Sequence, residues 1–241
     1  MKTALVTGAS KGIGKGIALE FARRGYRVFV NYNSDRPGAE AVAAETGGTA
    51  VQANVGVSDD VRRMFDATGP VDVLVNNAGV QTWKPLLELT EPEWDRVIDT
   101  NLKGCFLCTQ AAAKLLVAQG RPGAIVNIGS GCNKVAFPNL VDYTASKGGI
   151  EQFTKVAAVE LGQYNIRVNC VAPGAVEIER TKNEAGDYGA TWAALTPLKR
   201  VGLPADVAQA VAWLSGEESA FVTGQTIWVD GGLFSKPAWP Y

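Results

Sequence analysis

Short, mainly apolar runs alternate with amphipathic stretches along most of the chain. Apolar runs of this length between turn signals are typical of buried strands, and they occur at about residues 3–7, 27–32, 50–53, 71–75, 124–128, 166–171 and 226–229. Stretches with helical periodicity separate them. Strands that alternate with helices predict an α/β fold, here a single-domain, doubly wound parallel sheet of the Rossmann type with helices on both faces.

Capping residues, prolines and glycines mark the ends of the predicted helices. The first helix runs through Ile17 and Phe21 to Gly25, a short helix is capped by Ser58, and a long helix runs from a capping box at 90–93 past Asn101. The next helix has Tyr143 and Lys147 at its start and an apolar face of Ile150, Phe153, Val156 and Ala157. The last helix runs from Pro204 to about residue 214. Residues 175–203 are polar and irregular, which favours a mobile substrate lid.

The composition excludes several classes of protein. With 241 residues, 46% hydrophobic and 20% charged residues and a formal net charge of -1, the chain has no electrostatic footprint for nucleic acid or an anionic membrane. No apolar run is long enough to cross a membrane, and Met1 leads straight into a strand, so no signal peptide is expected. Four cysteines suggest reduced thiols in a cytoplasmic protein; Cys105 and Cys108 fit a helix core, whereas Cys132 is close enough to Ser130 to line a site.

The chain contains no histidine. This absence excludes Ser-His-Asp hydrolases, Cys-His proteases and nearly all catalytic zinc sites. Proton transfer must therefore use tyrosine, lysine or carboxylate groups, and no metal ion is expected.

Ser130, Tyr143 and Lys147 form the strongest catalytic candidate. Four-residue spacing places Tyr143 and Lys147 on one face of a helix. An unperturbed tyrosine has a pKa near 10, and a cation about 4 Å away contributes roughly 4 kcal/mol, or about three pKa units, at an effective dielectric of about 20. Lys147 would thus let Tyr143 exchange a proton with a substrate oxygen, which Ser130 would hold.

A glycine-rich turn follows the first strand and leads into the first helix. It reads T-G-A-S-K-G-I-G from Thr7 to Gly14. Glycines in this context let the backbone approach a pyrophosphate, which the free N–H groups at the helix N-terminus then bind. The pattern predicts a dinucleotide site.

The end of the second strand bears on the choice of dinucleotide. An NAD site usually has a carboxylate there for the ribose 2′-hydroxyl, whereas a 2′-phosphate favours a basic residue. Asn31, Tyr32, Asn33 and Ser34 contain no acid, and Lys11 lies in the glycine turn. The sequence thus favours NADP, with NAD left open by Asp35.

Motifs along nearly the whole chain resemble the short-chain dehydrogenase/reductase family, especially β-ketoacyl-carrier-protein reductases and related carbonyl reductases. They are T-G-x-x-x-G-x-G (Thr7 to Gly14), N-N-A-G (Asn76 to Gly79), N-x-x-G (Asn101 to Gly104), Ser130, Y-x-x-x-K (Tyr143 and Lys147), P-G (Pro173 and Gly174) and V-D-G-G (Val229 to Gly232). Their order along the chain is that of the family.

The resemblance implies roles for individual residues. Tyr143 is the general acid, Ser130 binds the carbonyl oxygen, Lys147 binds the nicotinamide ribose and lowers the Tyr143 pKa, and Asn101 orders a water that links Lys147 to solvent. The implied cofactor contacts are Gly8, Ser10, Lys11, Gly12, Ile13, Gly14, Asn31, Tyr32, Asn33, Ser34, Asn54, Val55, Asn77, Ala78, Gly79, Ile128, Tyr143, Lys147, Pro173, Gly174 and Val176.

The substrate is expected to contact Ser130, Cys132, Phe137 and Tyr143. The pocket should be lined by residues 81–87, 131–139 and 175–200. Trp83, Phe137 and Trp192 would form apolar walls, and Asn133, Lys134 and Asn139 would add polarity.

Three features depart from the family pattern. Asn54 replaces a frequent aspartate, and Ile178 stands where a threonine commonly contacts the nicotinamide amide. Carrier-protein reductases have basic residues around the site mouth; Arg121 fits, but Tyr164 and Asn165 stand where another basic residue is common. These differences favour a small free ketone or aldehyde over a substrate delivered by an acyl carrier protein, which stays possible.

Three functions are therefore considered. The first is an NADPH-dependent reductase of a ketone, aldehyde or β-ketoacyl thioester. The second is an NAD-dependent sugar or polyol dehydrogenase with the same catalytic residues, and the third is a non-catalytic cofactor-binding sensor, which the intact Asn101, Ser130, Tyr143 and Lys147 disfavour.

The family resemblance also implies a homotetramer that pairs through the last strand and the helix before it. Residues 233–241 include three aromatics and two prolines. Such a tail is unusual for a solvent-exposed chain end. It is predicted to lie across a neighbouring subunit.

Overall fold

A single parallel sheet organises the molecule. The structure, a computed structural model, describes residues 1–184 and 187–235. Its seven strands all run parallel in the order β3-β2-β1-β4-β5-β6-β7. They are β1 (Thr3–Val6), β2 (Arg27–Tyr32), β3 (Thr49–Gln52), β4 (Val73–Asn76), β5 (Gly123–Ile128), β6 (Ile166–Pro173) and β7 (Thr226–Val229). The predicted doubly wound Rossmann-type fold is confirmed.

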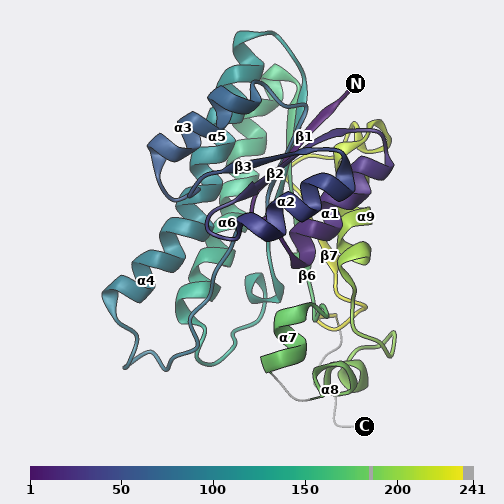
Figure 1. Cartoon of the computed structure of the whole chain (residues 1–241). Helices are drawn as coiled ribbons and strands as arrows, with labels where there is room; N and C mark the ends of the chain where they lie inside the picture. Colours follow the sequence, from purple (N-terminus) through teal and green to yellow (C-terminus); the bar gives the residue numbers. More distant parts are fainter. Residues whose placement is uncertain (185–186, 236–241) are drawn as a thin grey trace.

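Helices cover both faces of the sheet (Figure 1). One face packs against α1 (Gly12–Arg23), α2 (Arg36–Thr46) and α9 (Pro204–Ser215), and the other against α3 (Ser58–Thr68), α5 (Gly104–Ala118) and α6 (Val141–Leu161). The remaining elements are α4 (Glu91–Ile98), a π-helical turn η1 (Asp99–Lys103), α7 (Glu179–Glu184), α8 (Tyr188–Leu195) and the short 3-10 turns η2 (Gly131–Asn133), η3 (Gly162–Tyr164) and η4 (Glu217–Ser219).

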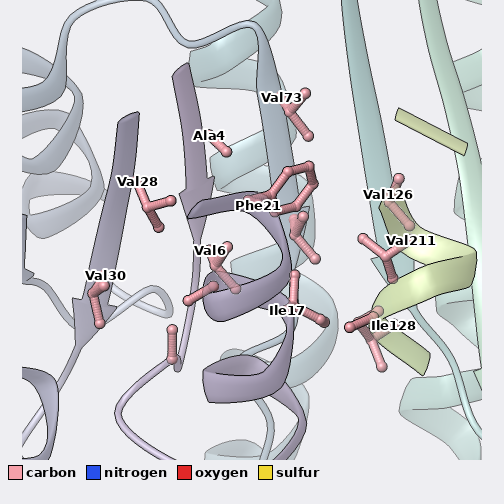
Figure 2. Packing of buried hydrophobic residues seen from close by; sticks show 14 of the residues in the cluster. Ala4, Val6, Ile17, Phe21, Val28, Val30, Val73, Val126, Ile128 and Val211 are labelled. Carbon is pink, nitrogen blue, oxygen red and sulfur yellow. The ribbon is translucent and has the colours of Figure 1, made fainter. Parts of the chain in front are cut away.

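Alternation along each strand divides the core into two layers. Ala4 and Val6 of β1 pack in the layer under α1, whereas Leu5 points to the opposite layer. Figure 2 shows Ile17 and Phe21 of α1 directed at the first layer. Burial on both faces explains why these strands are nearly continuous apolar runs.

The strand order reverses between β1 and β4. Loops that leave the carboxyl ends of strands diverge at such a point and form a crevice for ligands. The glycine turn follows β1 and the N-N-A-G segment follows β4, so the fold brings two motifs about 70 positions apart to the same crevice. Among the described residues, no helix is both long enough and apolar enough to cross a membrane.

Two predicted helices differ in detail, and one observed helix was not predicted. Ser58 is the first residue of α3 rather than its cap, because Val57 holds the N-cap position with no side-chain bond. Residues 36–46, to which no element was assigned, form α2 with Asp35 as cap. The helix from the Thr90 capping box is confirmed at its start, but the turn η1 interrupts it at Asn101 before α5 begins.

The prediction that residues 175–203 are irregular is wrong. They contain α7 and α8, which lie together below the sheet in Figure 1. Asp187 caps α8 by accepting a hydrogen bond from the Ala190 backbone N–H at 3.0 Å. Capping and the alanines of α8 favour helix although the segment lacks an amphipathic pattern.

The C-terminal aromatic tail is described only as far as Ser235. The part predicted to cross a neighbouring subunit, residues 236–241, lies outside the described residues. Phe234 is described, and its ring packs on Gly131 of its own chain.

Candidate active site

The glycine turn builds the floor of a groove at the carboxyl edge of β1. Gly8 has φ +60°, and a Cβ there would lie 2.8 Å from the Ala78 Cα, so only glycine lets the two segments approach this closely. Asn77 ties them together by donating to the carbonyl oxygens of Thr7 (2.8 Å) and Gly8 (3.0 Å). No side chain caps the N-terminus of α1. Its N–H groups are therefore available to an anion.

The groove encloses about 640 Å³. The structure brings together most of the predicted cofactor contacts along it: Gly8, Ser10, Lys11, Gly12, Ile13, Gly14, Asn31, Tyr32, Asn33, Ser34, Asn54, Val55, Asn77, Ala78 and Gly79. An adjoining cavity of about 190 Å³ is lined by the others: Ile128, Tyr143, Lys147, Pro173, Gly174 and Val176.

The far end of the groove holds the groups that bear on the choice of dinucleotide. The Asn31 side chain is buried, donates to the carbonyls of Val51 and Ala53 (3.2 Å each) and accepts from the Gly8 N–H at 3.1 Å. Its amide therefore braces the glycine turn from within. Lys11 is exposed and its Nζ lies 4.0 Å from Asp35 Oδ2, so a cation and a carboxylate share this end.

Ser130, Tyr143 and Lys147 converge on the 190 Å³ cavity. Ser130 follows β5 in extended conformation and caps η2 through its Oγ, which accepts from the Cys132 N–H at 3.3 Å. Lys147 lies one turn beyond Tyr143 on α6. The Lys147 Nζ is buried, donates to the Ile128 carbonyl at 2.7 Å and lies 5.5 Å from the centroid of the Tyr143 ring.

Asn101 is fixed next to this group by the π-helical turn. Its Nδ2 donates to the Val80 carbonyl (2.9 Å) and to Ser146 Oγ (3.0 Å), and its Oδ1 accepts from the Val80 N–H (2.8 Å). A methyl group on Gly79 would lie 3.4 Å from Asn101 Oδ1 and 3.7 Å from Lys147 Nζ. Both polar atoms therefore face one small space beside Gly79.

A larger pocket of about 620 Å³ opens from the same place. All four predicted substrate contacts line it, namely Ser130, Cys132, Phe137 and Tyr143, and so do the predicted walls Trp83 and Trp192. Within the described part of the chain, Asn133, Lys134 and Asn139 do not. Asn133 Oδ1 instead accepts from the Ser130 N–H at 3.1 Å, and Lys134 lies over the Trp228 ring.

Several lining residues were not predicted individually, among them Arg180, Thr181, Tyr188 and Phe234. The first three come from α7 and α8, whose placement over the groove no local pattern reveals. Burial raises the pKa of the Tyr188 phenol, while a hydrogen bond with the Val176 backbone and the Arg180 charge oppose that shift. The Thr181 Oγ1 accepts from the Ile178 N–H at 2.9 Å. Thr181 therefore places a hydroxyl next to Ile178, the position at which the family commonly has a threonine.

The thiols near the site are buried. Burial raises the pKa of Cys105 to about 12 and that of Cys170 to about 11, although the charge of Lys147 opposes both shifts. Both groups are therefore neutral at physiological pH and act as core residues, as predicted for Cys105.

Arg121 lies away from the site mouth, contrary to expectation. It donates from Nη2 to Asp72 at 2.6 Å. Asp72 precedes β4 and Arg121 precedes β5, so this ion pair lies at the amino edge of a parallel sheet whose carboxyl edge carries the site. Within its own chain, Arg121 cannot reach a substrate at Ser130.

The arrangement suits proton transfer to an oxygen where the 190 Å³ cavity meets the 620 Å³ pocket. A phenol and a serine hydroxyl line the shared space, and a buried ammonium lies behind the phenol. Such a set can hold and protonate a carbonyl oxygen that lies against the end of a long groove suited to a dinucleotide.

Known proteins resemble this chain over nearly its whole length. A family model described as enoyl-(acyl carrier protein) reductase matches residues 8–234. The 3-oxoacyl-(acyl-carrier-protein) reductase FabG of Staphylococcus epidermidis is 43% identical, with 97% of this chain and 99% of that protein covered. The 3beta-hydroxysteroid dehydrogenase 1 of Eggerthella lenta is 41% identical, with coverage of 100% and 96%. The crystal structure of acetoin dehydrogenase YohF from Salmonella typhimurium superposes with a TM-score of 0.89 at 33% identity, covering 99% of this chain and 98% of that one.

Proposed function

The chain belongs to the short-chain dehydrogenase/reductase family of oxidoreductases, and we propose that it reduces a ketone, an aldehyde or a β-ketoacyl thioester to an alcohol with NADPH. The observation that carries the proposal is the convergence of Ser130, Tyr143 and Lys147 where the dinucleotide groove meets the 620 Å³ pocket. A substrate carbonyl in that pocket can reach both hydroxyls.

Each residue of the set has a distinct task in this reaction. The Ser130 hydroxyl holds the carbonyl oxygen, and Tyr143 gives that oxygen its proton as hydride arrives at the carbon. The Lys147 ammonium stabilises the charge left on the phenol oxygen. Asn101 and Lys147 face the space beside Gly79, where a water can pass a replacement proton inward.

The groove fits a nicotinamide dinucleotide. Its glycine turn offers the close backbone approach and the uncapped helix N-terminus that a pyrophosphate needs, and its other end opens beside Tyr143 and Lys147. When bound, NADPH supplies the hydride. The Lys147 ammonium would hold the nicotinamide ribose, and Lys11 would face the 2′-phosphate.

Asp35 supports a second candidate, an NAD-dependent sugar or polyol dehydrogenase. Its carboxylate lines the groove and could bind a ribose 2′-hydroxyl. It also accepts from the Gly38 N–H at 3.2 Å as the cap of α2, which accounts for an acid here without a cofactor role. NADPH therefore stays the first choice.

The names of the relatives support two substrate types, a 3-oxoacyl thioester and a free ketone. Arg121 is paired with Asp72 at the opposite edge of the sheet. It therefore adds no basic docking patch beside the mouth of the pocket. This position favours a free ketone, and an acyl carrier protein remains a candidate partner. We further propose a homotetramer, which the family resemblance implies.

Replacing Tyr143 by phenylalanine tests the proposed function. We expect kcat with NADPH and an activated ketone to fall by about 100- to 10,000-fold, since the chain has no histidine to take over. Cofactor affinity and the thermal midpoint should stay close to wild type. Tyr26→Phe, which removes a phenol on the α1 side of the core, serves as the matched control. Near-native kcat in Tyr143→Phe would refute the mechanism.

A further inference from the structure

The 620 Å³ pocket has two chemically different ends. Gln81, Ser130, Tyr143, Arg180 and Thr181 line both this pocket and the small cavity beside Lys147, so the polar side chains gather where the two join. The residues that line only the large pocket are almost entirely apolar: Trp83, Gly131, Cys132, Phe137, Leu140, Ala175, Trp192 and Phe234.

Aromatic rings from separate parts of the chain form the apolar end. Trp83 comes from the loop before α4, Phe137 from the segment before α6, Trp192 from α8 and Phe234 from the turn after β7. Tyr188, one turn before Trp192, lies with its ring centroid 6.1 Å from that of Trp192. Neighbouring rings on one helix make an extended aromatic surface.

Phe234 is held in place by its own turn. Asp230 accepts from the backbone N–H groups of Gly232 and Phe234, both at 2.9 Å. The Phe234 ring then meets Phe137 and Trp228 nearly edge to face, with centroids 6.1 and 6.2 Å apart. Edge-to-face contacts fix the ring plane.

Gly131 completes this wall. A Cβ at Gly131 would overlap the Phe234 ring, so the absence of a side chain next to Ser130 is what admits the ring. An apolar plane thus stands one residue away from the hydroxyl proposed to hold the carbonyl oxygen.

We propose, resting on the reductase function above, that the substrate is a ring-bearing ketone whose fused or aromatic rings lie among Phe137, Trp192 and Phe234 with the carbonyl at Ser130 and Tyr143. Ring faces gain from aromatic walls beyond simple burial. A rigid ring system also loses less conformational freedom on binding than a straight chain of equal carbon number. The volume falls within the roughly 300–1,000 Å³ of pockets that enclose such ligands.

Two ten-carbon ketones test the proposal, 2-tetralone with a fused ring system and 2-decanone with a straight chain. With saturating NADPH, wild type should show a kcat/KM for 2-tetralone about tenfold or more above that for 2-decanone. Phe234→Leu and Trp192→Leu keep an apolar side chain at each position but remove a ring. Each should lower the 2-tetralone value several-fold and leave the 2-decanone value within about twofold.

Trp94→Leu is the matched control, because Trp94 lies on α4 outside the pocket lining. This variant should leave kcat/KM unchanged for both ketones. Equal use of both ketones by wild type overturns the proposal, as does an equal loss for both in the two pocket variants. Turnover of acetoacetyl-coenzyme A without turnover of 2-tetralone overturns this inference and leaves the proposed reductase function standing. No turnover of any of the three with NADPH or NADH refutes both.

Discussion

Gly79 shows how a missing side chain shapes this site at the scale of one residue. The space where its Cβ would stand lies between Asn101 Oδ1 and Lys147 Nζ. Its backbone needs no left-handed conformation, so alanine is sterically allowed there. The glycine therefore preserves room for a small molecule between two polar groups rather than a special backbone shape.

Gly79→Ala should consequently lower kcat with little effect on folding. The methyl group would make ordinary contacts but fill the space for a proton-carrying water, and we expect a loss of about tenfold or more at saturating cofactor. Gly148→Ala is the control, because its Cβ would meet open space next to Lys147. It should keep kcat and raise the thermal midpoint slightly. Unchanged kcat in Gly79→Ala would argue against proton resupply by this path.

Lys11 makes a second prediction at the residue scale. If it faces a 2′-phosphate, Lys11→Ala should lower kcat/KM for NADPH by about tenfold and leave that for NADH nearly unchanged. Lys15→Ala, which removes a cation paired with Glu45 outside the groove, should leave kcat/KM unchanged for both NADPH and NADH. A wild-type preference for NADH, lost in Asp35→Asn, would instead support the polyol dehydrogenase candidate.

At the scale of elements, α1 carries the glycine turn and depends on its own charges. Glu20 accepts from Arg23 (2.8 Å) and from Arg24 (2.7 Å) one turn later. The hydrogen bonds from Arg23, then those from Arg24, lower the pKa of Glu20 from 4.5 to about 2 although burial opposes the shift. Because the folded pKa is depressed, this carboxylate stabilises the fold above pH 4.5, and the gain is lost as the pH falls towards 2.

Glu20→Gln should therefore destabilise the protein by about 1 kcal/mol at pH 7. The difference from wild type should shrink between pH 4.5 and 2, as followed by urea unfolding at several pH values. Glu40→Gln serves as the control, because its pair with Arg36 is long (3.5 Å) and exposed, and should cost less than about half as much. A pH-independent difference would assign the effect to helix packing instead.

At the scale of the whole molecule, an apolar groove is exposed on the described part of the chain. A groove of about 450 Å³ between α5 and α6 is lined by Phe106, Phe153 and Val156. Val156, which the sequence places on the apolar face of α6 with Ile150, is 58% exposed, and Val159 beyond it is 81% exposed. An apolar helix face of this kind is typical of a surface that another subunit covers, and it supports self-association alongside the sheet edge β7.

In the proposed tetramer, Val156→Glu would place a charge without a partner in a buried contact, which is costly. The variant should therefore have a smaller mass than wild type when measured by light scattering. Val57→Glu is the matched control, since Val57 is 44% exposed outside this groove and should leave the mass unchanged. A tetramer that survives Val156→Glu would place the contact elsewhere. Deleting residues 235–241 tests the tail separately, through mass and KM.

The strands, the glycine-rich turn and the proposed catalytic residues could be predicted from the sequence alone. Buried parallel strands require continuous apolar runs, and a glycine-rich turn between strand and helix has few alternatives, so local pattern was sufficient there. Tyr143 and Lys147 lie one helical turn apart, and helical spacing alone places them on one face.

Features that depend on contacts between distant segments follow only from the tertiary structure. It buried Asn31 under the glycine turn, moved Arg121 to the amino edge of the sheet and left Val156 in a surface groove. It also folded residues 175–203 into helices and brought Phe234 against Gly131, about a hundred positions away. None of these follows from local periodicity, because each rests on packing that exists only once the sheet has assembled and placed its loops at one edge.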